Sequence, residues 1–135
     1  MIADLERAAH LVGAHVERAA QAFGITHAEA HVLALLARER SVSIARLHRA
    51  SAIKRSTLTN ILDRLEGRGL VRRELNPDDR RSFTIHLTRK GAAQARHVVR
   101  ALDELEATIR AGLGEQDLRG FERVLDAVAA AAARP

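Results

Sequence analysis

A run of basic and short polar side chains occupies residues 54–64. Its members are Lys54, Arg55, Ser56, Thr57, Thr59, Asn60 and Arg64. In the major groove of DNA an arginine pairs with guanine edges and an asparagine with adenine, while hydroxyl side chains suit phosphates or thymine methyl groups. An ordinary surface helix would pair acids with bases, yet the first acid after Lys54 is Asp63. The run favours contact with nucleic acid, although the spacing does not fix which side chain reads which base.

A second basic group follows in residues 76–81, whose sequence is Asn-Pro-Asp-Asp-Arg-Arg. Proline and aspartate form turns, so the segment is expected to be a hairpin tip that carries Arg80 and Arg81. Arginine is favoured in a narrow minor groove, where Asp78 or Asp79 could hold the guanidinium by a charge-assisted pair. Alone, the tip could equally be a solvated turn whose charges cancel. Placed after the polar run, it predicts a second DNA contact made by Asp79, Arg80 and Arg81.

The histidines are weaker candidates for chemistry. His27 and His31 are four residues apart, a helical spacing that can bind zinc, but Glu29 lies on another face and no HExxH pattern is present. The alternative is two surface or partly buried histidines. The chain has no cysteine, which excludes disulfides, cysteine-ligated zinc and thiol redox sensing. No nucleophile elbow, phosphate loop or paired carboxylates are found, so neither an enzyme nor a cofactor is expected.

Positive charge is concentrated in the middle of the chain. The net charge is +5, distributed as −2 over residues 1–37, +8 over residues 38–90 and −1 over residues 91–135. This distribution indicates a central module that meets a polyanion, the alternative being a solvated arginine-rich surface. The first residues lack the basic end and apolar run of a signal peptide, and no stretch approaches the roughly 18 apolar residues of a membrane span. A cytoplasmic protein without a membrane partner is expected.

Periodicity and capping signals predict the elements that carry these groups. Apolar residues spaced by three and four predict helices, and alternation of apolar with polar residues predicts strands. Thr26 with Glu29 has capping-box spacing, and Ser43 and Thr88 are further cap candidates. The expected helices are 4–22, one after Thr26, one from Ser43 through Arg49, 54–66, 88–111 and one after Gly114, with strands at 70–75 and 82–87.

Two helices joined by a short turn and followed by a hairpin are typical of a winged helix-turn-helix. The predicted fold is therefore mainly α with a small β-hairpin wing, and 135 residues fit one integrated domain. Residues 26–87 are expected to form the DNA-binding lobe, and residues 1–25 and 88–135 a helical dimerisation region. The long helix 88–111 and the alanine-rich end carry apolar stripes that one small lobe cannot cover, so a two-fold partner is expected.

Three motifs together resemble the MarR family of bacterial regulators. They are the run from Arg55 to Arg73, the Asn-Pro-Asp-Asp-Arg-Arg segment at 76–81, and Leu87-Thr-Arg-Lys-Gly91. The resemblance covers the whole chain and implies a homodimer, built from the first and last two helices, on a pseudo-palindromic operator. It implies that Arg55, Ser56, Thr57, Thr59 and Asn60 face the major groove, and that Asp79 and Arg80 or Arg81 form the wing contact.

Many members of that family are repressors released by a small ligand that binds between the dimerisation helices and the DNA-binding lobe. His10, His31 and His97 fall on helices where the resemblance would place such a pocket, or they are surface groups that titrate. One departure is Lys54, which stands where a capping Asp or Ser is often found; a lysine cannot accept the free amide protons, whereas its charge attracts phosphate.

The sequence thus predicts a sequence-specific transcriptional regulator, a ligand-responsive repressor that binds double-stranded DNA as a homodimer. Two alternatives stay open at this point. One is a zinc-responsive regulator that uses histidines. The other is a winged helix used for protein–protein contact, whose wing and fourth helix should be less basic than these.

Overall fold

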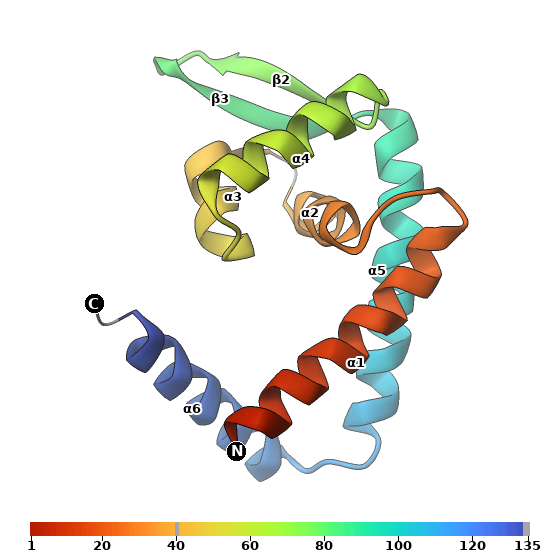
Figure 1. The fold of residues 1–135 in the computed structure, drawn as a ribbon, viewed down its shortest axis with the longest axis vertical. Helices are drawn as coiled ribbons and strands as arrows, with labels where there is room; N and C mark the ends of the chain where they lie inside the picture. Colours follow the sequence, from red (N-terminus) through yellow and green to blue (C-terminus); the bar gives the residue numbers. More distant parts are fainter. Residues whose placement is uncertain (40, 134–135) are drawn as a thin grey trace. The chain divides into compact units, whose positions relative to one another are not determined.

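Six helices and three short strands make up the computed structural model, which describes residues 1–39 and 41–133 (Figure 1). The helices are α1 (Ile2–Gln21), α2 (His27–Arg38), α3 (Ile44–Ser51), α4 (Arg55–Gly67), α5 (Arg89–Arg110) and α6 (Glu115–Ala132). The chain divides into two compact units, Met1–Leu102 and a second unit that begins at Asp103. Every predicted helix is present, with bounds that differ by a few residues at most.

The helix ends follow the capping signals of the sequence. Thr26 and Glu29 form a reciprocal capping box at the start of α2, and the Ser43 hydroxyl accepts a hydrogen bond from the backbone N–H of Arg46 in α3. Thr88 Oγ1 accepts from the backbone N–H of Gly91, 3.0 Å away, at the start of α5. Each cap satisfies an amide that the first helical turn leaves without a partner.

The sheet differs from the expected two-stranded hairpin, because it has three antiparallel strands. They are β1 (Val42–Ser43), β2 (Val71–Asn76) and β3 (Asp79–Leu87), in the order β1-β3-β2. Val42 is buried and pairs with Ile85. A two-residue strand is too short to show alternation, and for this reason the sequence did not reveal it. The β2–β3 hairpin projects from the first unit, with its turn at the end away from α5 (Figure 1).

The apolar stripe of α4 is buried as predicted. Leu58, Ile61, Leu62 and Leu65 are all 1 % exposed or less, and they join a core that takes side chains from α1, α2, α3, α5 and the sheet. Burying each such side chain contributes roughly 1.5–3 kcal/mol. The opposite face of α4 is left in solvent, so the core fixes which side of this helix a partner can reach.

The junction between β2 and α5 explains the Leu-Thr-x-x-Gly motif. The carbonyl oxygen of Leu70 accepts hydrogen bonds from the backbone N–H and from Oγ1 of Thr88, at 3.0 and 3.2 Å. A Cβ atom on Gly91 would lie 1.8 Å from that same oxygen. Only glycine allows α5 to start this close to the base of the wing.

The second unit contains the end of α5 and the whole of α6. The exposed large apolar side chains in this unit are Ile109, Leu113, Phe121, Val124 and Leu125, and α6 buries no residue. Among the described residues, no helix combines the length and the apolar character that crossing a membrane requires.

Candidate nucleic-acid interface

Helices α3 and α4, with the turn between them, form a helix-turn-helix. The turn contains Ala52, whose φ of 54° lies in the left-handed region, and the Ser51 hydroxyl accepts a hydrogen bond from the backbone N–H of Ile53. A non-glycine residue in this conformation costs of the order of 1 kcal/mol. The turn is therefore held by its surroundings, and it sets the direction of α4 from the end of α3.

The N-terminal half of α4 presents the predicted polar run to solvent. Lys54, Arg55, Ser56, Thr57, Thr59 and Asn60 are all exposed. Lys54 is the N-cap residue and makes no side-chain cap, and the first turn contains no acid. Thr59 donates its hydroxyl to the backbone carbonyl oxygen of Arg55 at 3.0 Å, which fixes the orientation of the Thr59 side chain. The uncapped amides and the adjacent cations make this end of α4 attractive to anions.

The structure sorts the cations of the helix and the wing into paired and unpaired groups. Within residues 1–39 and 41–133, no ion pair is recorded for Lys54, Arg55, Arg80 or Arg81. Other arginines in this region are paired: Arg72 with Glu74, and Arg73 with Asp63 and Glu66. These four unpaired cations therefore lie at the start of α4 and at the wing tip, the two places where the sequence predicted DNA contacts.

The wing tip is tighter than the predicted turn over residues 76–81. Asn76 ends β2 and accepts a hydrogen bond from the backbone N–H of Asp78, while Asp79 already begins β3. Asp79 Oδ1 accepts from the backbone N–H of Arg81 at 3.0 Å. In the described part of the chain, no ion pair joins Asp78 or Asp79 to either arginine, so the expected hold on the guanidinium is replaced by bracing of the backbone. Arg80 and Arg81 are both exposed.

Arg73 fastens the base of the wing to α4. Arg73 Nη2 lies 2.6 Å from Asp63 Oδ1 and Nη1 lies 3.2 Å from Glu66 Oε2, and the backbone N–H of Arg73 donates to Glu66 Oε1 at 3.2 Å. The Arg73 side chain is only 22 % exposed. This contact fixes the spacing between the polar face of α4 and the wing.

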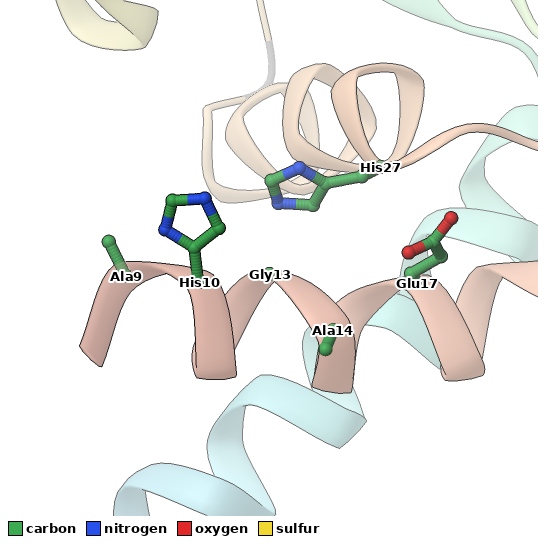
Figure 2. A pocket seen from close by; sticks show the side chains of 6 residues that line it. All are labelled: Ala9, His10, Gly13, Ala14, Glu17 and His27. Carbon is green, nitrogen blue, oxygen red and sulfur yellow. The ribbon is translucent and has the colours of Figure 1, made fainter. Parts of the chain in front are cut away.

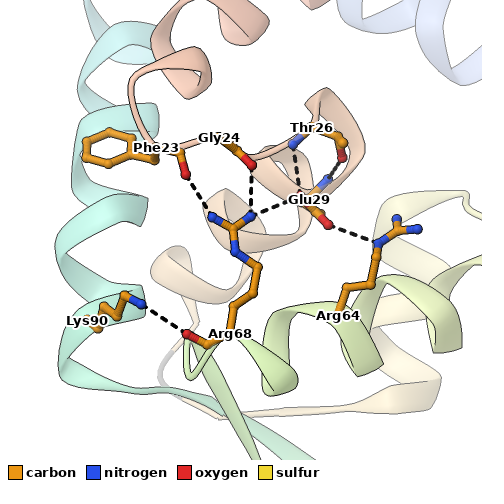
Figure 3. Close-up of polar contacts among 7 residues, drawn as sticks. All are labelled: Phe23, Gly24, Thr26, Glu29, Arg64, Arg68 and Lys90. Atoms are coloured by element: carbon orange, nitrogen blue, oxygen red, sulfur yellow. Dashed lines mark hydrogen bonds and ion pairs between the residues drawn. The ribbon is translucent and has the colours of Figure 1, made fainter.

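The DNA contact predicted for Arg64 stays a prediction: its side chain is 57 % exposed, and its Nε donates to Glu29 Oε1 at 3.0 Å. Glu29 is buried on α2, and Arg68 completes the group by donating to the carbonyl oxygens of Gly24 and Phe23 at 2.9 and 2.8 Å (Figure 3). This role of Glu29 and Arg68 was not predicted from the sequence. Glu29 and Arg64 are 35 positions apart, and nothing in the sequence indicated that their side chains meet. Arg49 is a further basic residue that was not predicted as a candidate for DNA contact. It is exposed in the last turn of α3 and forms no ion pair with any described residue.

A hollow of about 450 Å³ lies between α1 and α2 (Figure 2). It is lined by Ala9, His10, Gly13, Ala14, Glu17 and His27. The His10 and His27 imidazoles point toward the same space, and the His27 ring packs where Gly13 has no side chain, with its Cε1 3.4 Å from an added Cβ. The hollow thus brings one carboxylate and two imidazoles together, and its remaining lining residues are alanine and glycine.

The other predicted pocket residues lie outside that lining. His31 is half-buried on α2, and burial, with a smaller effect from His27, lowers the pKa of its imidazole. The His97 ring packs against Phe23, with the ring centroids 5.0 Å apart and the ring planes tilted by 43°. Among the residues that the structure describes, no three His, Asp or Glu side chains group as a metal site, so His27 and His31 gain no third ligand.

The chain is similar to known proteins in both sequence and fold. The MarR family model matches residues 25–83. The HTH-type transcriptional regulator PecS of Dickeya dadantii (strain 3937) is 31 % identical over 131 residues, which cover 95 % of this chain and 79 % of PecS. A mutant form of MarR from E. coli complexed with operator DNA is 26 % identical with a TM-score of 0.71, covering 94 % of each chain. NadR in complex with 4-hydroxyphenylacetate is 26 % identical with a TM-score of 0.81, covering 93 % of this chain and 89 % of NadR.

The sequence match extends over nearly the whole chain, and the helix-turn-helix, the wing and the flanking helices are those of the matched structures. The chain therefore belongs to the MarR family of winged helix-turn-helix transcriptional regulators.

Proposed function

We propose that this chain binds operator DNA in a sequence-specific way, with the N-terminal half of α4 in the major groove and the wing tip in the adjacent minor groove. The observation that carries the proposal concerns the described cations of α4, its N-cap and the wing. Those that form no ion pair lie at these two places: Lys54 and Arg55 at the start of the helix, and Arg80 and Arg81 on the wing. An unpaired cation can bind a phosphate without first breaking an ion pair, whereas a paired cation must give up its partner.

The side chains next to these cations supply the means of reading sequence. Arg55 and Asn60 are the residues able to make two-point contacts to guanine and adenine, and Ser56, Thr57 and Thr59 are short enough to lie against phosphates or thymine methyl groups. The matched MarR structure, which holds operator DNA, supports the same use of this surface here.

The DNA-binding form is proposed to be a homodimer. Exposed apolar side chains are found on α1, including Ile2, Leu11 and Val12, and on the second unit, including Phe121 and Leu125. A second copy would cover such faces and would present two copies of α4 to successive turns of DNA. Protein–protein use of the winged helix is the rival function, and the unpaired basic surface argues against it.

Repression relieved by a small molecule is proposed as the mode of regulation. The hollow between α1 and α2 supports it, because its two imidazoles and one carboxylate could orient a polar ligand. The matched NadR structure holds 4-hydroxyphenylacetate, which makes this compound the first probe to use. It should lower DNA affinity when added to the binding assay; unchanged affinity at millimolar concentration would exclude this ligand.

A salt series tests the DNA-binding proposal against protein–protein use. Affinity for a mixed-sequence duplex is expected to fall steeply with salt, because each phosphate neutralised contributes a log–log slope of about −0.9. Four unpaired cations predict a slope of about −4 for each protomer, measured by fluorescence anisotropy at several salt concentrations. No binding at the lowest salt, or affinity that does not depend on salt, would contradict the proposal.

A further inference from the structure

Glu29 is a buried acid that belongs to three contacts at once. Its side chain is 4 % exposed, Oε2 accepts the backbone N–H of Thr26 at 2.9 Å, and Oε1 accepts Arg64 Nε at 3.0 Å. Arg68 Nη1 lies 3.7 Å from Oε2. A buried carboxylate is stable only when its charge is compensated, so the two arginines are required where they are.

The same group joins three segments of the first unit. Arg64 and Arg68 come from the end of α4, Phe23 and Gly24 from the end of α1, and Glu29 from α2 (Figure 3). The carbonyl oxygen of Arg68 in turn accepts Lys90 Nζ from α5 at 3.1 Å. The C-terminal end of α4 is therefore anchored on one side by the α1–α2 junction and on the other by α5.

Arg64 lies four residues after Asn60, on the strip of α4 that continues the proposed reading face. Its side chain is 57 % exposed, so it could reach a phosphate if it were free. Its guanidinium is directed instead toward α2, where Glu29 neutralises it. The paired and unpaired arginines of α4 thus occupy opposite ends of the helix.

We propose that Glu29 is a positioning residue for DNA recognition, which holds the C-terminal end of α4 on the α1–α2 junction and withholds Arg64 from phosphate. The inference rests on the proposed DNA-binding function. Withholding Arg64 limits the non-specific part of binding, so contact with DNA depends on the residues of the N-terminal half, which read bases. The ratio of operator affinity to mixed-DNA affinity is therefore set partly by Glu29.

The test is Glu29→Gln, because glutamine keeps an oxygen for the Thr26 cap and loses the charge that holds Arg64. Glu106→Gln is the control: it removes the same charge from a carboxylate that also binds an arginine Nε, 2.7 Å away on Arg110 of α5, but that is 51 % exposed. Binding is measured across a salt series on a mixed-sequence duplex and on a duplex that carries a site selected from random DNA.

Glu29→Gln is expected to bind the mixed duplex at least about threefold more tightly at low salt and to make the slope more negative by about one per protomer, as one new phosphate contact requires. The ratio of selected-site to mixed-duplex affinity should fall. The double variant Glu29→Gln with Arg64→Gln should return to the parental slope. A slope and ratio equal to those of Glu106→Gln would overturn the proposal, and so would a change that persists in the double variant.

Two further measurements test the role of Glu29: the salt dependence of Arg64→Gln and hydrogen exchange in the free protein. Arg64→Gln alone should leave the parental slope unchanged, whereas a slope shallower by about one would show that Arg64 contacts phosphate and would overturn the proposal. In the free protein, Glu29→Gln should accelerate amide hydrogen exchange over residues 64–70 while Glu106→Gln does not. Equal exchange rates over residues 64–70 in the two variants would contradict the anchoring role of Glu29, even if the protein binds DNA. Faster exchange in a protein that binds no DNA would support the anchoring and reject only the proposed function.

Discussion

Gly91→Ala is expected to lower the free energy of unfolding by about 3 kcal/mol or more, the upper range of the cost of overpacking a tight site. The added Cβ would lie 1.8 Å from the carbonyl oxygen of Leu70, which is backbone and cannot rotate away. Moving it would disturb both hydrogen bonds from Thr88 that join the base of the wing to α5. Helix propensity alone predicts the opposite sign, because alanine in a helix interior is favoured over glycine by roughly 0.5–1 kcal/mol.

Chemical denaturation of the two proteins measures this difference. Gly67→Ala is the matched control, since Gly67 is the last residue of α4, has no positive φ and would meet nothing within 4 Å of an added Cβ. The control should be neutral or slightly more stable than the parent. A Gly91→Ala protein as stable as the parent would show that α5 can start further from Leu70 than the structure indicates.

The sequence was sufficient to predict features that depend on neighbours along the chain. The capping box of Thr26 and Glu29, the cap of Ser43 and the apolar stripe of α4 all act within a few residues, and each is present as expected. The position of Arg80 and Arg81 at a hairpin tip was also predicted, because Pro77 and the two aspartates mark the turn locally, although the expected pairing of a guanidinium with Asp78 or Asp79 is not seen among the described residues. Such signals do not require knowledge of the tertiary fold.

Features that join distant segments could not be predicted in this way. Capping-box spacing revealed that Glu29 accepts the Thr26 amide, but nothing indicated that its other oxygen receives Arg64 from 35 residues away. Arg64 was therefore grouped with the DNA-facing residues that share its helical strip. Similarly, β1 has two residues and is recognisable only through its pairing with β3. In each case the missing information was which element packs against which.

Arg55→Ala is expected to weaken operator binding by about 1–3 kcal/mol, between about fivefold and a hundredfold or more, and to relax the preference at one position of each half-site. Arg55 is the first residue of α4, is exposed, and no ion pair is recorded for it among the described residues. Its removal therefore leaves the rest of the fold unaltered. Affinities of parent and variant for a panel of duplexes with single base changes provide the measurement.

Arg119→Ala is the matched control for Arg55→Ala, because it removes an exposed arginine of the second unit whose ion pair among the described residues is local, with Glu115 four residues earlier. Its affinity and base preferences should equal those of the parent. If Arg55→Ala lowers affinity on every duplex by the same factor, Arg55 contacts phosphate and another residue of α4 reads that base.

Selection of binding sites from random DNA tests the central claim most directly, because it requires binding, base reading and two-fold assembly together. The expected product is a pseudo-palindrome whose half-sites are centred about one helical turn apart, roughly 10 base pairs, as two copies of α4 on one face of DNA require. Recovery of no preferred sequence, under salt conditions in which mixed DNA is bound, would contradict sequence-specific recognition by α4, and recovery of a single unpaired half-site would contradict the homodimer.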